Sequence, residues 1–298
     1  MGKLRPLWTP GGARGSSRPA GVPALATPPL ANGVCFFEDF FAPSLGTAGW
    51  ASGATATPDT LTNLAPLGHP AWIASEPIGT TGIVEALSST VAWLNGCGTV
   101  NLKTGTTSGN TIALSQGATS TSGCATAVAS STQSALGQWR VAQTSAAHQA
   151  ASNTGFGWIS TTLAFGSDWI TDPDTTLATV AALVFTRHIA SYSGDPAGDL
   201  VARLYAPAAS YSATSATIVA AAGMNATSAY KIEAFFDGIN QTLPIYVNGA
   251  LVTTFSLASI SATSASLRCE AIIQSTSAAT KFLAVDSYYS EQYQATAR

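Results

Sequence analysis

The chain has 298 residues, of which only 9% are charged, and its formal net charge at pH 7 is −3. Average globular proteins contain about 25% charged residues, and a surface this poor in charge promotes association between proteins. The composition therefore argues against a freely diffusing enzyme and favours a protein that works inside an assembly. Because the sequence contains no apolar run of about eighteen residues or more, we expect no membrane-spanning helix.

Residues 1–34 differ in composition from the rest of the chain. Six prolines and repeated glycines exclude a helix or a central strand. Four of the twelve basic residues lie here with no acidic residue before Glu38, so this segment carries +4 and the remainder −7, which sum to −3. We expect an extended, polyproline-like N-terminal arm with a reach of about 100 Å. A disordered tail is the alternative.

The N-terminal arm also bears on targeting and on partners. Prolines and glycines interrupt any apolar stretch after its first basic residues, so no signal peptide is expected. If a neighbouring chain holds the arm, Leu4 and Trp8 are the expected anchors, and the basic residues would meet acidic surface on that partner. Nucleic acid is disfavoured, since four charges make a thin electrostatic footprint. The candidate partner-binding residues are Lys3, Leu4, Arg5, Trp8, Arg14 and Arg18.

Residues 35–298 are expected to form one β-sandwich domain, because short apolar segments alternate with turn-forming ones. Residues 115–137, nearly all Ser, Thr, Ala and Gly, are expected to be a loop or weak strands at a rim. No amphipathic helical segment of useful length stands out. The expected strands are 35–41, 83–88, short strands within 93–114, 138–142, 154–161, 176–188, 200–205, 216–222, 230–237, 243–247, 250–257, 267–274 and 281–289.

The clearest pattern lies in residues 230–257. Tyr230, Ile232, Ala234 and Phe236 fall on one face of a strand, and the other face carries Lys231, Glu233 and Asp237. This alternation is typical of a strand with one buried face. An Asp-Gly turn follows, and an Asn-Gly turn joins the next two apolar runs. Because Asn-Gly between apolar runs is a strong hairpin signal, the segment predicts three adjacent antiparallel strands.

These motifs carry a resemblance to a known fold family. An aromatic strand, a D-G turn, Y-V-N-G at 246–249 and the apolar-aromatic stretch KFLAVDSYY at 281–289 resemble concanavalin A-like jelly rolls, which include laminin-G domains, legume lectins and bacterial glucanases. The resemblance implies an all-β, antiparallel jelly-roll β-sandwich. It implies little about function, because this fold hosts binding, catalytic and structural roles.

The carboxylates do not match the catalytic pattern of the glucanases in that family. Those enzymes place their acid and nucleophile on one strand face, about 5 Å apart, but no E-x-D-x-x-E run occurs here. Glu38 and Asp39 are adjacent, so in a strand they point to opposite faces. We therefore expect no hydrolase activity and assign no catalytic residue.

Metal and nucleotide sites are also not expected. Asp172, Asp174, Asp195 and Asp199 could ligate calcium, but Asp-Pro and Gly-Asp are ordinary turn formers, and we favour turns. The histidines His69, His148 and His188 are far apart in sequence, and no phosphate-binding glycine motif is present. No metal or cofactor is therefore expected.

Cysteines and tryptophans have simple interpretations. Four cysteines match neither a zinc motif nor a disulfide framework and are expected to be free thiols, with Cys97 and Cys124 the one pair to check for a bridge. Seven tryptophans raise the idea of a sugar-binding platform, but Trp93, Trp139 and Trp158 lie in apolar strand contexts, which favours the core.

The general layout of residues 35–298 resembles virion structural proteins of tailed bacteriophages with concanavalin A-like modules: F-x-D-F near the start, G-F-G-W at 155–158, Y-V-N-G, and a closing V-D-x-Y. What the resemblance implies is a non-enzymatic capsid decoration or cement protein, assembled in the host bacterial cytoplasm. Its partners would be the major capsid protein or other virion proteins and its own copies, as a dimer or trimer. A tail or fibre component and a carbohydrate-binding receptor protein are the alternatives.

Overall fold

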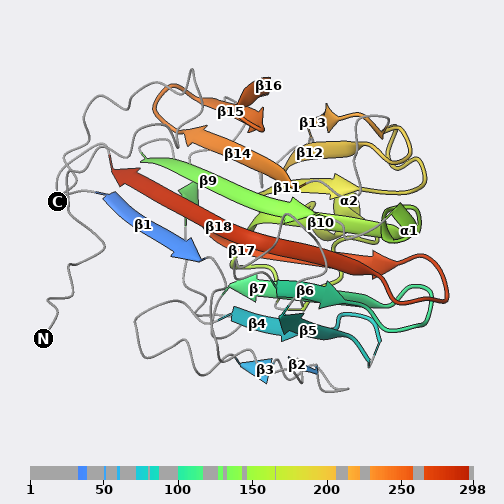
Figure 1. The fold of residues 1–298 in the computed structure, drawn as a ribbon. Coiled ribbons are helices and arrows are strands. Elements are labelled where there is room, and N and C mark those ends of the chain that lie inside the picture. The colour runs from blue at the N-terminus through green and yellow to red at the C-terminus, as the bar shows by residue number, and fades with distance from the viewer. Residues whose placement is uncertain are drawn as a thin grey trace, which may run out of the picture.

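A computed structural model of the chain describes residues 33–38, 50–51, 59–60, 72–79, 81–86, 100–116, 127–129, 133–142, 146–164, 166–205, 214–221, 229–257 and 265–294. These residues form two antiparallel sheets that face each other (Figure 1). Apart from Gly33 and Val34, which begin the first strand, the N-terminal arm and its six candidate residues lie outside the described residues.

Sheet A has nine strands in the order β16-β15-β14-β9-β18-β6-β5-β2, with β1 paired to β18. Its long central strands are β9 and β18, and β16 ends the order on one side. The strands are β1 (Gly33–Glu38), β2 (Trp50–Ala51), β5 (Ile83–Ala86), β6 (Val100–Lys103), β9 (Gln133–Ala142), β14 (Tyr230–Asp237), β15 (Thr242–Val247), β16 (Ala250–Ser256) and β18 (Phe282–Gln294).

Sheet B also has nine strands, in the order β13-β12-β11-β10-β17-β7-β4-β3, with β8 paired to β17. All the strand pairs of both sheets are antiparallel, which confirms the predicted all-β antiparallel sandwich. The strands are β3 (Asp59–Thr60), β4 (Trp72–Ser75), β7 (Thr111–Gln116), β8 (Ala127–Ala129), β10 (Ser152–Ser160), β11 (Ala182–Arg187), β12 (Leu200–Tyr205), β13 (Thr214–Val219) and β17 (Ala265–Ser275).

The described residues contain two helices of four residues each, α1 (Ala146–Gln149) and α2 (Pro173–Thr176). Neither helix in this part of the chain approaches the length or apolar character that crossing a membrane would require. The second helix overturns part of the prediction for 176–188, where the strand starts only at Ala182. Asp172 caps α2 by accepting a hydrogen bond from the Thr175 N–H at 3.2 Å, and Pro173 opens the first turn, which are helix-start signals.

The three strands predicted within 230–257 are confirmed as β14, β15 and β16. Asn248 and Gly249 both adopt positive φ, at 50° and 86°, as a tight hairpin turn requires. One expectation for this segment is wrong: β14 is buried on both faces. Glu233 is 0% and Phe235 2% exposed, although their face was expected to be the polar one.

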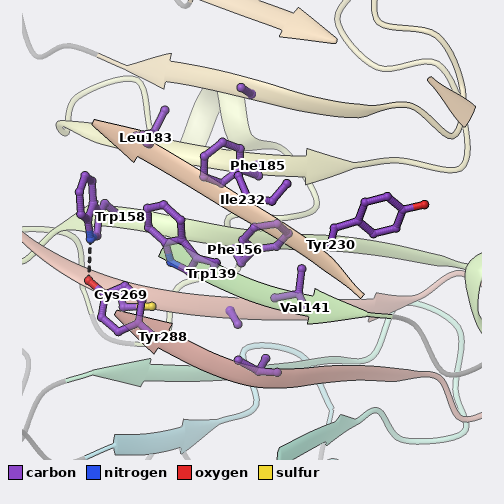
Figure 2. Packing of buried hydrophobic residues seen from close by; sticks show 14 of the residues in the cluster. Trp139, Val141, Phe156, Trp158, Leu183, Phe185, Tyr230, Ile232, Cys269 and Tyr288 are labelled. Atoms are coloured by element: carbon purple, nitrogen blue, oxygen red, sulfur yellow. Dashed lines mark hydrogen bonds between the residues drawn. The ribbon is translucent and has the colours of Figure 1, made fainter. Parts of the chain in front are cut away.

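The inter-sheet core lies between the two sheets and is centred on aromatic side chains (Figure 2). The ring of Trp139 packs edge-on against Trp158 and Phe185, with centroids 5.1 and 5.3 Å away. The indole N–H of Trp158 donates to the Tyr288 hydroxyl at 2.7 Å, a bond between the two sheets. The expected core position of Trp139 and Trp158 is therefore confirmed, while Trp93 lies outside the described residues.

Candidate functional site

A second buried cluster lies on the side of sheet B that faces away from sheet A. Strand β17 shows the division, because Cys269 and Ala271 belong to the inter-sheet core whereas Ile272 belongs to the second cluster. Residues 161–181 supply the side chains that cover this face, among them Trp169, Ile170 and Leu177, all fully buried. We call these residues and the sheet B side chains they cover the outer layer.

Trp169 is the anchor of the outer layer. Its ring lies directly over Gly155, where an added Cβ would meet ring atoms at 2.5 Å. The first glycine of the G-F-G-W motif therefore makes room for a tryptophan fourteen positions later in sequence. The second, Gly157, has a φ of 150°, and a Cβ there would collide with the Leu183 carbonyl oxygen.

A fully buried carboxylate lies under Trp169. Glu270 accepts hydrogen bonds from the Trp169 indole N–H and the Ser115 hydroxyl, both at 2.6 Å, and from Arg268 Nε at 3.3 Å. Arg268 also donates to the Leu163 carbonyl oxygen at 3.2 Å. Three donors hold Glu270 as a structural carboxylate, which leaves little of its acceptor capacity for chemistry.

A group of charged side chains that ranges from buried to exposed lies beside the outer layer. We call it the aspartate cluster: Asp172, Asp174 and Asp195 with Tyr192 and Arg203. The Arg203 guanidinium, only 2% exposed, pairs with Asp195 and with Asp174, the latter at 3.4 Å. One arginine thus faces two carboxylates, and with Asp172 the cluster carries three negative charges against one positive.

Tyr192 ties the aspartate cluster together. Its hydroxyl donates to Asp172 Oδ1 at 2.6 Å and accepts from the Asp174 N–H at 2.9 Å. Its ring lies 4.5 Å from the His188 ring, nearly parallel to it, and 4.8 Å from the Arg203 guanidinium carbon. Two neighbours therefore occupy the ring of Tyr192, which leaves it poorly placed to stack on a ligand.

Hydrogen bonds and burial shift the pKa values of three side chains in and beside the aspartate cluster. The bonds from Tyr192 and Thr175 hold the pKa of Asp172 below its usual value, so Asp172 is ionised at neutral pH. Burial and the bond to Asp172 raise the pKa of Tyr192. Burial lowers the pKa of His188, whose Nε2 lies 2.9 Å from the Ile170 carbonyl oxygen. The pKa shift of Asp172 is downward, which does not favour a general acid.

The charged side chains of the described sandwich are mostly buried or half-buried. Of the charged side chains whose burial the structure describes, Asp172 is the exposed one, and all the others are buried or half-buried. The described outer surface is therefore mostly Ser, Thr, Ala and Gly. The buried charged residues are Arg187, Asp199, Arg203, Glu233, Asp237, Arg268, Glu270 and Lys281.

The aspartates considered for calcium have other roles in the structure. Asp172 caps α2, Asp174 and Asp195 pair with Arg203, and Asp199 accepts hydrogen bonds from the Ala221 N–H and the Thr217 hydroxyl. In the described part of the chain, no three His, Cys, Asp or Glu side chains are arranged to hold a metal ion. These four residues are cap, turn and ion-pair residues, as the turn interpretation expects.

The remaining candidates are only partly covered by the structure. Cys269 is a buried free thiol, whereas Cys97, Cys124 and His69 lie outside the described residues. The sequence analysis did not find Trp169, Arg203 or Glu270. A buried Arg-x-Glu pair in an apolar strand is a visible signal, but its partners come from β7 and from residues 161–181 and cannot be read locally.

Comparisons with known proteins give a likeness of fold alone. No protein-family model and no curated protein matches the sequence. Among solved structures, peanut lectin in complex with a 9-residue peptide has a TM-score of 0.48 and 12% identity over 89% of this chain and 99% of its own. The potassium-bound Emp46p carbohydrate recognition domain has a TM-score of 0.43 and 9% identity, covering 76% and 89% of the two chains.

An endo-1,3-β-glucanase from Streptomyces sioyaensis has a TM-score of 0.43 and 9% identity, covering 88% of this chain and 97% of its own. Lectins and glycoside hydrolases thus both occur among the matches. At these scores and identities they carry no argument about a ligand or an activity. The topology itself is that of a two-sheet antiparallel β-sandwich.

Proposed function

We propose that this chain is a non-enzymatic structural protein of a virion, namely a capsid decoration or cement protein of a tailed bacteriophage. In this proposal the N-terminal arm docks on neighbouring capsid subunits and the sandwich packs beside them on the particle surface. The observation that carries it is the placement of charge: of the charged side chains whose burial the structure describes, Asp172 alone is exposed, and the others are buried or half-buried. A surface poor in charge suits permanent contact with other proteins.

The carboxyl groups support a non-catalytic role. Burial raises the pKa of Glu76 and Glu233, as a general acid would need. Glu76, however, accepts a backbone N–H from Gly82, and Glu233 lies opposite Tyr246 and Gln138 in its sheet. No second carboxylate is among the described contacts of either residue, and the glycosidase mechanism requires a pair of them.

The test uses particles that lack this protein. The full chain should bind them, and a variant lacking residues 1–34 should lose binding while its circular dichroism remains that of a β-protein. A matched variant that keeps the arm length but replaces Lys3, Arg5, Arg14 and Arg18 with glutamine separates charge from reach. Undiminished binding by the truncated protein would refute the docking role of the arm.

Carbohydrate binding is the second candidate, as in a receptor-binding tail or fibre component. It is favoured by the aspartate cluster, where the exposed carboxylate of Asp172 lies beside a tyrosine and could accept sugar hydroxyls. Glycan-array binding that survives removal of the arm but is lost in Asp172→Asn would support this candidate over the first.

A further inference from the structure

Two edge strands meet on one side of the sandwich, and neither carries a charge. Strand β16 ends sheet A and β13 ends sheet B among the described strands, and the two contact each other (Figure 1). Their sequences, ALVTTFS and TSATIV, contain no Lys, Arg, Asp, Glu or Pro. Edge strands of proteins that stay monomeric usually carry such residues, because they block pairing with another chain.

The exposed side chains of β16 are apolar or hydroxylic. Leu251 is 57% and Val252 41% exposed, and Thr254 is exposed as well. A bulge in the pairing with β15 lies at Val252, because Tyr246 opposes Leu251 whereas Ile245 opposes Thr253. Bulges hinder edge pairing, but this one lies near the start of the strand and leaves 253–256 in regular register.

The backbone of this regular part is directed outward at Thr254. The Leu257 N–H donates to the Gln241 carbonyl oxygen of the neighbouring chain segment. Because backbone groups alternate along a strand, the N–H and carbonyl groups of residues 255 and 253 also face β15. Thr254 lies one residue out of this alternation, in a non-hydrogen-bonded pair with Pro244, so its own N–H and carbonyl are directed away from β15. The edge therefore offers a peptide group for a further antiparallel strand.

We propose that this edge is the surface on which a second copy of the chain docks, by antiparallel pairing of β16 with β16 of the partner copy. A two-fold axis perpendicular to the sheets would bring β16 to β16 and β13 to β13 at once, since the two edges lie side by side. An antiparallel strand edge is self-complementary under such an axis.

Charge and composition favour a second copy over other occupants. The edge has no charge with which to select a charged partner, and nothing in it repels its own copy. The N-terminal arm fits poorly as an added strand, because its six prolines cannot donate to a ladder. This inference concerns the sandwich alone and holds whether or not the arm docks on a capsid.

The test measures mass in solution by sedimentation equilibrium of the full chain. We expect a dimer for the native chain and a dissociation constant raised at least about tenfold in Thr254→Lys, which sets like charges across the two-fold axis. Thr254→Pro should do the same, because it removes an outward N–H without breaking a bond to β15. The matched control is Thr106→Lys, an exposed threonine in the turn between β6 and β7, which should remain dimeric.

Each outcome decides the inference. A native chain that is monomeric at tens of micromolar, or Thr254 variants that dimerise as tightly as Thr106→Lys, would overturn it. A dimer that is lost only when the arm is removed would also overturn it and would point to arm exchange. Circular dichroism of every variant ensures that loss of dimer is not loss of fold.

Discussion

The inter-sheet core and the outer layer both bury aromatic side chains but hold them in different ways. In the inter-sheet core, aromatic and aliphatic side chains from alternating strand positions interdigitate, and the bond between Trp158 and Tyr288 is a polar contact within an apolar interior. In the outer layer, Trp169 closes over an ion pair, so that apolar packing and buried charge depend on each other.

The difference shows where small changes should have large effects. Removing a methylene from the inter-sheet core leaves a cavity that its apolar neighbours can partly fill. Removing one member of the Glu270 network leaves a charge or a donor without a partner in a place that water does not reach. The outer layer should therefore be the more fragile of the two, although it is the smaller.

The largest effect is expected for Glu270→Gln. The substitution keeps the size of the side chain but leaves the buried Arg268 guanidinium without its carboxylate. Breaking a buried ion pair in this way costs about 3–5 kcal/mol, which urea unfolding monitored by tryptophan fluorescence would measure. The double variant Arg268→Met, Glu270→Leu should recover much of the loss, because it removes both charges. A single variant as stable as the native chain would contradict the network.

A smaller effect is expected for Gly155→Ala. The added methyl group would meet the Trp169 ring, so the ring must shift or the strand must move. Overpacking of this kind costs about 1–3 kcal/mol. The loss should shrink when Gly155→Ala is combined with Trp169→Leu, and a double-mutant cycle would measure that coupling. Strictly additive losses would mean that the two residues do not meet.

The inter-sheet core and the outer layer also differ in how far the sequence predicts them. Alternation and turn residues predict β14 to β16 and the core position of Trp139 and Trp158, because strand periodicity and hairpin chemistry are local. The outer layer depends on residues 161–181, whose fold follows from one helix cap at Asp172 and from contacts with strands that are distant in sequence. The 13-residue segment 176–188 begins at the end of α2 and continues into β11, and its composition alone predicts one strand.

The same reasoning applies to the aspartate cluster. Asp172, Asp174 and Asp195 are visible in the sequence as turn formers, and that interpretation agrees with the structure. Their meeting around Arg203, which is on β12, depends on how β11 and β12 pair. Sequence spacing alone does not show that these carboxylates meet one arginine. Apart from Arg203, strand β12 is apolar and gives no sign of a charged partner.

Tyr288→Phe tests a buried polar contact of the inter-sheet core, as Glu270→Gln does for the outer layer. It removes the acceptor of the Trp158 indole N–H and leaves that donor buried. The expected loss is about 1–2 kcal/mol, less than for Glu270→Gln, because no charge is involved. The control Phe156→Leu alters the same core without touching a polar group. If Tyr288→Phe destabilised the chain more than Glu270→Gln, the proposed contrast between the core and the outer layer would be wrong.

The smallest effect is expected in the pH dependence of stability at Glu233 of sheet A, which is buried like Glu270 but has fewer partners. Lys231 pairs with it, with Nζ 2.8 Å from Oε1, and in the described part of the chain Oε2 has no hydrogen-bond donor. Burial raises the pKa of Glu233. A carboxyl whose pKa is higher in the folded chain adds stability below its unfolded pKa of about 4.3, and this stability is lost as the pH rises through the folded pKa.

Glu233→Gln should therefore flatten the decline in the free energy of unfolding between pH 4 and pH 7. Lys231→Gln should steepen that decline, because it removes the cation that favours the ionised form. Asp172→Asn is the control of opposite sign, since hydrogen bonds lower the pKa of Asp172 and its stabilisation is lost as the pH falls. Equal slopes in the native chain, Glu233→Gln and Lys231→Gln would mean that Glu233 is solvated in solution.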